Sequence, residues 1–464
     1  MSNTSQLTPT GTIKATTRMG RIAAAAVVGT AIEWYDYFVY ASIAALLFGK
    51  LMFEPAGPNF SSIIAFLTIG ISFLFRPLGA IIAGHLGDKH GRRPVLVGTV
   101  IIMGLGTALL GVLPTYSQAG LTGPILIVCL RIVQGLAVGG EWGGASLLAV
   151  EHSQKNRRGL MGSMVQLGVP IGLLLASAVL AILESVFRGA AFEVWGWRVA
   201  FWISLVLVLV GFWVRRAVDE SPVFRELEAR QTKAKVPIAR LFAKYALLIL
   251  FAMLVMAGNN AVGYMTTGGY VQKYTTDPSG PIGLAPGPVL WAVTASAGMW
   301  AISIFLGGWV SDKIGRRWTY VIGFLVQGAA VITLWPVVNT GSLGALYGAL
   351  LFLGFALGIT NSGALPAWFA ELFPTSVRFS GASITYAIGA IVGGAFAPTI
   401  AAAIYGSTHS TNGITWYLLA MTAAGLVGTL LLRERKGISL KASDEEDQSK
   451  GLYVWEKPSP LLTE

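Results

Sequence analysis

The chain has 464 residues, of which 54% are hydrophobic and 12% are charged. A soluble globular protein carries roughly a quarter charged residues, so this chain has too little charge to cover a water-facing surface. Its apolar runs approach the roughly 20 residues that cross about 30 Å of hydrocarbon. The composition excludes an ordinary soluble protein and predicts an all-α, polytopic integral membrane protein.

Twelve transmembrane helices are predicted from the apolar runs. In chain order, the expected spans are 22–48, 60–84, 94–113, 122–148, 159–185, 197–214, 244–270, 287–309, 318–338, 343–364, 379–405 and 414–432. The basic residues fall almost entirely in alternate loops and in the two terminal segments, whereas the other loops carry few cations, such as Lys50 and Lys273. Because Lys and Arg concentrate in cytoplasmic loops, both termini are predicted to be cytoplasmic, in a bacterial-type inner membrane.

The net charge of +11 is explained by this topology. Nucleic-acid binding would need a basic stripe with interleaved stacking aromatics on a polar face, and the sequence has none. The single cysteine, Cys129, lies in an apolar run and offers neither a disulfide nor a metal-ligand set. We therefore expect no nucleic-acid partner, no metal and no cofactor.

Two patterns recur at nearly the same offset along the chain. The run GHLGDKHGRR at 84–93 returns as GWVSDKIGRR at 308–317, and the pair Glu151 and Arg158 returns as Glu371 and Arg378. The offsets are 224 and 220 residues, nearly half the chain, which indicates a duplication. Each pattern follows the second or fourth helix of its half, so the halves are predicted to be parallel repeats about an axis along the membrane normal.

This duplication sets the expected domain organisation. The predicted units are an N-terminal six-helix bundle, a charged cytoplasmic linker, a C-terminal six-helix bundle and a cytoplasmic tail, at 1–214, 215–243, 244–432 and 433–464.

The repeated loop resembles the signature Gly-x-x-x-Asp-x-x-Gly-Arg-Arg/Lys of the major facilitator superfamily. Further matches are RIVQG at 131–135, DESP at 219–222 and ELFPTSVR at 371–378. The resemblance covers nearly the whole chain. It implies two bundles that rock about a central site, which opens alternately to either side.

Within the superfamily, EWYDYF at 33–38 and GGEWGG at 139–144 resemble the metabolite:proton symporter family. That family includes carriers of α-ketoglutarate, citrate, shikimate, and proline or betaine. Sugar porters share some motifs, but their glutamine-rich seventh helix is not evident at 253–270. The resemblance implies a monomeric, proton-coupled symporter of a small polar metabolite, an organic acid or a zwitterion rather than a hexose.

Charges near mid-membrane are the first candidate functional residues. An ionisable side chain at the centre of an isolated helix costs about 2.5–3.5 kcal/mol, so it usually faces a cavity or a partner. Glu33 and Asp36 lie one turn apart near the middle of the first helix, and Arg131 lies near the middle of the fourth. We expect a first-helix acid to pair with Arg131, either for structure alone or, as the resemblance implies, to couple protonation to substrate binding.

Proton coupling is assigned to Asp36, with Glu33 and Glu141 as further candidates; Glu141 can alternatively form a structural pair with Arg76. The expected substrate contact is Arg131. Other polar or amphipathic groups in apolar helices are candidate cavity residues, or packing contacts: Gln134, Tyr37, Tyr40, Gln166, Asn259, Asn260, Tyr264 and Tyr386.

The duplicated loops predict a cytoplasmic gate that closes one side of the carrier and breaks when it opens inward. Loop anchoring alone is the alternative. The residues assigned to the gate are Asp88, Arg92, Arg93, Glu151, Arg158, Asp312, Arg316, Arg317, Glu371 and Arg378.

The energy source is expected to be an ion gradient, because no phosphate-binding loop of the Gly-x4-Gly-Lys-Ser/Thr kind occurs. No nucleophile with a base, metal cluster or cofactor motif stands out, which disfavours an enzyme. An energy-independent facilitator or exchanger of the same fold stays open, and a membrane-embedded enzyme or nutrient receptor is the remote alternative.

Overall fold

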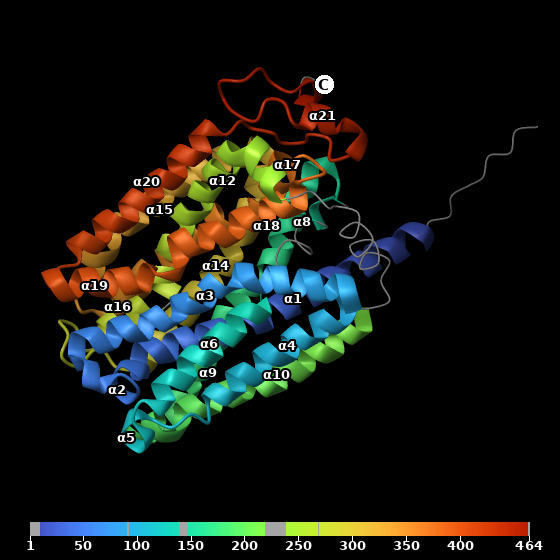
Figure 1. Cartoon of the computed structure of the whole chain (residues 1–464). Helices are drawn as coiled ribbons and strands as arrows, with labels where there is room; N and C mark the ends of the chain where they lie inside the picture. Colours follow the sequence, from blue (N-terminus) through green and yellow to red (C-terminus); the bar gives the residue numbers. More distant parts are fainter. Residues whose placement is uncertain are drawn as a thin grey trace, which may run out of the picture.

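The structure is a computed structural model that describes residues 10–90, 92–138, 147, 149–151, 153–218, 238–267 and 269–462. Over these residues the chain is almost entirely helical, and its β structure is one isolated bridge between Leu432 and Tyr453. Figure 1 shows long helices side by side, with the C-terminal segment lying across one end. We call this the tail end and the opposite one the far end.

The first half of the chain supplies the helices drawn in blue to light green in Figure 1. Their bounds are α1 (Thr10–Ile43), the π-helical η1 (Ala44–Phe48), α2 (Gly49–Leu51), the 3-10 turn η2 (Glu54–Ala56), α3 (Gly57–His90), α4 (Arg92–Leu110), α5 (Tyr116–Ala119), α6 (Thr122–Val138), the 3-10 turn η3 (Lys155–Arg157), α8 (Arg158–Gln166), α9 (Gly168–Val186), the π-helical η4 (Phe192–Gly196) and α10 (Trp197–Val218).

The second half repeats this arrangement and adds the C-terminal segment. Its bounds are α12 (Ile238–Thr267), α13 (Tyr270–Thr276), α14 (Pro286–Ile314), α15 (Arg316–Val338), α16 (Leu343–Leu357), the π-helical η5 (Gly358–Ser362), α17 (Leu365–Leu372), α18 (Arg378–Gly389), the π-helical η6 (Ala390–Ala395), α19 (Ala397–Thr408), α20 (Asn412–Leu431), the 3-10 turn η7 (Ala442–Asp444), α21 (Glu445–Gln448) and the 3-10 turn η8 (Pro460–Leu462).

Nine helical stretches in the described residues are long and apolar enough to cross a membrane. Two shorter apolar helices, Ile101–Leu110 and Thr122–Val138, are also present. Together with α1 they account for the twelve predicted helices, so the predicted fold class is confirmed. The predicted linker is shortened from both sides, because α10 continues to Val218 and α12 begins at Ile238; the residues between them lie outside the described ranges.

Two seams join the halves of the bundle. Along one seam α14 packs against α8 and α9, and along the other α3 packs against η6 and α19. At the tail end of the first seam, a Cβ added to Gly159 would lie 2.4 Å from the carbonyl oxygen of Gly308. A Cβ on Gly308 would lie 2.8 Å from the carbonyl oxygen of Gly159. Gly308 is the first residue in the second copy of the repeated pattern. The close approach of the two helices explains why this position is a glycine, because a side chain would clash there.

The far end is closed by a helix break in the second half. Gly269 has φ +94°, a conformation that L side chains rarely adopt, and α13 starts directly after it. A Cβ on Gly269 would lie 2.6 Å from the Cβ of Ala45 in η1. The rings of Tyr270 on α13 and Phe66 on α3 have centroids 6.1 Å apart. The two halves therefore touch at both ends of the bundle.

Candidate functional site

A cavity lies between the halves, about midway along the helices. The space not filled by atoms is about 390 Å³, including the open part at its mouth. Its lining comes from α1, α8, α9, α12, α14 and α18: Trp34, Phe38, Gln166, Val169, Met256, Asn260, Gly263, Tyr264, Thr267, Trp300 and Tyr386. Four of these, Gln166, Asn260, Tyr264 and Tyr386, are candidate cavity residues from the sequence. Trp34, Trp300 and Thr267 are not.

Aromatic rings form much of the cavity wall. The ring of Trp34 lies with its centroid 6.0 Å from that of Tyr264, so α1 and α12 meet through their aromatic side chains. Tyr37 stands behind them, 5.3 Å from Trp34 and 5.5 Å from Tyr264 in edge-on contacts. None of the described side chains in the lining is charged. The walls therefore offer π faces, amides and hydroxyls to an occupant.

Two buried N–H donors in the lining have no hydrogen-bond partner. Asn260 is 3% exposed and Trp300 is 4% exposed, and neither Nδ2 of Asn260 nor Nε1 of Trp300 finds an acceptor. A buried polar group left unpaired costs about 1–3 kcal/mol. Such donors fit a cavity that receives a polar occupant. An indole in the middle of an apolar helix was the one sequence signal for Trp300, because buried Trp N–H groups normally have a partner.

Asp36 lies inside the first half, outside the cavity lining. Its carboxyl is buried at 3% exposure, and Oδ2 accepts a bond of 3.0 Å from Oγ1 of Thr107 on α4. Nε2 of Gln134 on α6 donates to the same threonine hydroxyl at 2.8 Å. Oδ1 of Asp36 has no partner. The acid is therefore bonded through Thr107, and the buried hydroxyl of Ser204 on α10 also lies beside it; the sequence patterns single out neither residue.

Arg131 is also buried in the first half, where Tyr40 covers it. Its guanidinium carbon lies 3.4 Å from the centroid of the Tyr40 ring, a cation–π contact that stabilises a desolvated charge by about 2 kcal/mol. The hydroxyl of Tyr40 is bonded to Thr68 at 2.5 Å. Among the described residues Arg131 forms no ion pair with Asp36, which differs from the expected pairing. Nε of Arg131 has no partner.

The other centrally placed candidates lie either outside the cavity lining or outside the described residues. Asn259 is 1% exposed, outside the lining, and neither atom of its amide has a partner. Glu33 is half-buried on α1. Arg76 on α3 lies with its guanidinium carbon 4.1 Å from the ring of Phe73. Glu141 lies outside the described residues.

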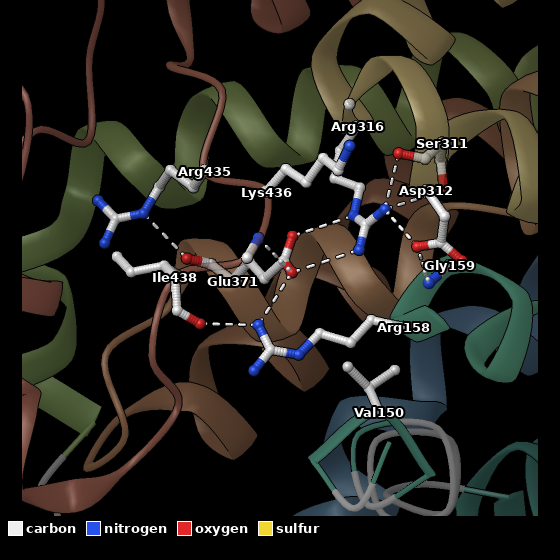
Figure 2. Close-up of polar contacts among 12 residues, drawn as sticks. Val150, Arg158, Gly159, Ser311, Asp312, Arg316, Glu371, Arg435, Lys436 and Ile438 are labelled. Atoms are coloured by element: carbon white, nitrogen blue, oxygen red, sulfur yellow. Dashed lines mark hydrogen bonds and ion pairs between the residues drawn. The ribbon is translucent and has the colours of Figure 1, made fainter. Parts of the chain in front are cut away.

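At the tail end, the side chain of Glu371 on α17 is fully buried and collects arginines from both halves. Arg158 on α8 donates to Oε1 at 3.1 Å, and Arg316 on α15 donates to Oε2 at 3.0 Å. Figure 2 shows the carboxylate between these two guanidinium groups. Arg158 belongs to the first half, so this contact joins the two halves.

Asp312 on α14 makes a second contact between the halves. Its two oxygens accept the backbone N–H groups of Gly159 and Leu160 at 2.8 and 2.9 Å, in the first turn of α8. Carboxylates stabilise helix N-termini in this way. Oδ1 of Asp312 also accepts from Arg316 at 2.7 Å (Figure 2), so Arg316 connects Asp312 with Glu371.

The second ion pair between the halves mirrors the first. Arg378 on α18 donates to Glu151 at 2.7 Å, so each repeat's arginine pairs with the other repeat's glutamate. Arg317 is held by the end of α20, because its guanidinium donates to the carbonyl of Leu430 at 2.9 Å. The side chains of the remaining gate candidates, Asp88, Arg92 and Arg93, lie outside the described part of the structure.

The C-terminal segment joins the same cluster, a contribution that the sequence patterns do not predict. The backbone N–H of Gly437 donates to Oε1 of Glu371 at 3.2 Å, and the carbonyl of Ile438 accepts from Arg158 at 2.7 Å. Glu434 accepts the backbone N–H of Arg317 at 2.8 Å. The tail end is therefore closed by three parts of the chain.

Comparison with known proteins gives two family matches and a set of full-length relatives. Residues 22–245 match the family described as sugar (and other) transporter, and residues 279–463 match the Major Facilitator Superfamily. The inner membrane metabolite transport protein YhjE of Escherichia coli K12 is 34% identical over 90% of this chain and 95% of its own. The shikimate transporter of the same organism is 34% identical, with the same coverage.

A further relative is the proline/betaine transporter of Escherichia coli K12, which is 30% identical over 93% of this chain and 87% of its own. Among solved structures, a D-xylose-proton symporter superposes with a TM-score of 0.69 at 18% identity, over 90% of this chain and 99% of that one. The three sequence relatives are transporters, not enzymes, and they match the metabolite:proton symporter group. The chain belongs to the major facilitator superfamily of membrane transporters.

Proposed function

We propose that this chain is a proton-coupled symporter that carries a small polar metabolite, an organic acid or a zwitterion, by alternating access. The observation that supports it best is the cavity, which is lined by helices of both halves and lies between contacts that join those halves at either end. A substrate in that position reaches water only when one set of contacts breaks.

The moving units of the proposal are the two six-helix bundles, 1–214 and 244–432, working as a monomer. The tail end is taken to face the cytoplasm, as the distribution of basic residues predicts. The ion pairs of Glu371 and Glu151 then form the cytoplasmic gate. Opening inward requires Arg158 to leave Glu371 and Arg378 to leave Glu151, because each pair joins one bundle to the other.

Proton coupling is assigned to Asp36, with Glu33 as its modulator. Asp36 is buried, and its Oδ1 has no partner, so that atom can take a proton without breaking a hydrogen bond. Its bond to Thr107, and through it to Gln134, ties α1 to α4 and α6. A change in the charge of Asp36 would therefore alter the contacts that join α1, α4 and α6 in the first bundle. The relative with a solved structure is described as a proton symporter.

The substrate class rests on the lining and on the relatives. The neutral donors of Asn260 and Trp300 suit a carboxylate, and the aromatic walls suit an apolar or cationic body. Shikimate and proline or betaine are the substrates in the names of two relatives. Arg131 lies behind the lining under Tyr40, so in this conformation it favours an anionic occupant through its charge rather than by contact.

Transport into proteoliposomes tests the proposal. Purified protein is reconstituted, and uptake of labelled carboxylates and zwitterions is followed with and without an inwardly directed proton gradient. A symporter accumulates substrate above its external concentration only with the gradient. Equal uptake that stops at equilibrium in both cases would identify a facilitator instead. Exchange of internal for external substrate without net uptake would identify an exchanger.

A further inference from the structure

The C-terminal segment Arg433–Leu462 is folded against the tail end of the bundle. The first residue of the segment pairs with a later part of it, because the N–H of Arg433 donates to the carbonyl of Leu452 at 3.0 Å. The N–H of Val454 donates to Leu431 at 3.1 Å, at the end of α20. Figure 1 shows the segment as a loop that runs over α20, α12 and α17.

Arg435 holds the loop in shape from inside. The side chain is fully buried, and its guanidinium donates to the carbonyls of Gln448, Lys450 and Gly451 at 2.5, 2.9 and 3.2 Å. Its Nε donates to the carbonyl of Glu371 at 2.9 Å. Burial lowers the pKa of Arg435 to about 10, which leaves it charged at neutral pH. One side chain therefore connects the fold of the segment with the helix that carries the gate glutamate.

The segment bonds to both halves next to Arg435. Gly437 donates to Glu371 of the second half, and Ile438 accepts from Arg158 of the first half. Arg158 thus has one partner in α17 and another in the segment (Figure 2). Separation of the two bundles at this end must break the bond to Ile438 as well as the ion pair.

The other end of the segment carries an aromatic pair at the edge of the bundle. Tyr453 and Trp455 are stacked, with centroids 4.9 Å apart and planes 9° apart. Both rings stand edge-on to Phe251 of α12, at 5.9 and 6.1 Å. Tyr453 is 8% exposed, whereas Trp455 is 57% exposed. The inner ring is packed against α12, and the outer ring faces away from the protein.

The surface next to Trp455 is the lipid-facing side of a membrane helix. Phe251 lies in the candidate span Leu241–Thr276, whose neighbouring residues Leu247 and Leu250 are 50% and 42% exposed. Trp455 continues that apolar surface beyond the helix. Lys457 follows Trp455 by two residues, and Lys244 lies seven residues before Phe251 on α12. Both lysines are exposed. Tryptophan is enriched where hydrocarbon meets headgroups, and basic residues there attract anionic lipids.

We propose that Arg433–Leu462 is a clasp that docks on the bilayer surface through Trp455 and keeps the gate at the tail end closed through Gly437 and Ile438. The partner is the headgroup region of the adjacent leaflet, because exposed Trp455 packs beside Phe251 at the edge of a membrane helix. The clasp links the state of the lipid surface to the equilibrium between the open and closed gate. It depends on neither the substrate nor the coupling ion.

Docking is tested with a fluorophore on the segment. In a Cys129→Ser background, Val454→Cys carries bimane, and the protein is placed in nanodiscs of anionic lipid with nitroxides near the headgroup or deep in the chains. The expected result is strong quenching by the shallow nitroxide and weak quenching by the deep one. Trp455→Ala should reduce the shallow quenching several-fold. Trp416→Ala, which removes an even more exposed tryptophan on α20, is the control and should change nothing.

Coupling to the gate is tested by cysteine accessibility without any transport assay. Ala367 on α17 is fully buried against α8 across the seam between the halves, so Ala367→Cys reports separation at the tail end. Deletion of 433–464 should raise its labelling rate about tenfold in nanodiscs, and Trp455→Ala a few-fold. Trp455 is exposed, so its loss leaves the packed core intact even where the deletion fails to fold.

The two readouts together decide the proposal. Equal quenching of bimane by shallow nitroxides before and after Trp455→Ala would show that this residue does not dock on lipid. Absence of quenching by either nitroxide in the unsubstituted protein would show that the segment does not contact lipid and would overturn the proposal. Unchanged labelling of Ala367→Cys in the Trp455→Ala and deletion variants would show that the segment does not hold the gate.

Discussion

The carboxylates of the tail-end gate and the polar side chains at the membrane centre differ in whether their atoms have hydrogen-bond partners. At the gate, Glu371 accepts from Arg158, Arg316 and Gly437, and Asp312 uses both of its oxygens. In the centre, atoms of several buried polar side chains have no partner: Asp36, Arg131, Asn259, Asn260 and Trp300. The carboxylates of Glu371 and Asp312 at the gate are satisfied by the protein alone in this conformation, whereas the centre has bonding capacity left for a proton and a substrate.

This difference predicts opposite responses to substitution. Removing one partner of a buried ion pair costs about 3–5 kcal/mol, because the other charge is left uncompensated. Removing a group that has no partner relieves a penalty of about 1–3 kcal/mol. Substitutions of the paired gate carboxylates should therefore lower stability, and substitutions of the unpartnered donors in the cavity lining should raise it while they weaken substrate binding.

The largest effect is expected for Glu371→Gln, which removes the charge shared by Arg158 and Arg316. We predict a loss of about 3–5 kcal/mol, seen as a lower thermal midpoint in detergent, and faster labelling of Ala367→Cys. Glu193→Gln is the matched control, because Glu193 pairs with Lys50 on the surface and such pairs contribute at most about 1 kcal/mol. Equal losses in the two variants would remove the distinction between the gate and ordinary ion pairs.

A smaller effect of the opposite sign is expected for Asn260→Leu. The apolar side chain removes an unpaired donor, so we predict about 1–2 kcal/mol more stability without substrate. The same change should weaken substrate binding about tenfold. Trp300→Phe should act in the same direction. Thermal shift with and without a transported substrate measures both effects, and a loss of stability with unchanged binding would show that Asn260 only packs.

The smallest effect is expected for Tyr40→Phe, which keeps the ring over Arg131 and removes the hydroxyl bonded to Thr68. One net hydrogen bond amounts to about 0.5–1.5 kcal/mol. Tyr40→Leu also removes the cation–π contact and should cost about 2 kcal/mol more. Identical thermal midpoints for the two variants would mean that the ring does not stabilise the buried guanidinium.

The helices and the repeat were predictable because both leave periodic marks in the sequence. Apolar runs place most of the twelve helices to within a few residues, although α1 and α12 begin 12 and 6 residues before their expected starts. The offset of the repeated Glu and Arg pair places Arg158 and Arg378 in equivalent positions of the two halves. Their crosswise pairing was not predictable. It depends on how the two bundles dock against each other, which local sequence patterns do not record.

The interior of the site was predicted only in part. Asp36 and Arg131 stand out as ionisable residues in apolar helices, but the sequence favoured a direct pair, and the chain instead places Tyr40 over Arg131 and Thr107 against Asp36. Aromatic and hydroxyl partners are common in membrane helices, so nothing marks them in advance. The clasp was missed for another reason: Arg435 bonds to backbone carbonyls, which carry no sequence signal.

The central claim, that Asp36 couples proton and substrate movement, is tested most directly by one variant in two assays. Asp36→Asn imitates the protonated acid and keeps an acceptor for Thr107. Reconstituted in proteoliposomes, it should lose accumulation driven by a pH gradient, yet still exchange substrate between compartments of equal pH at a rate near that of the unsubstituted protein. Accumulation at the full level in Asp36→Asn would contradict the account and move the coupling role to Glu33 or Glu141.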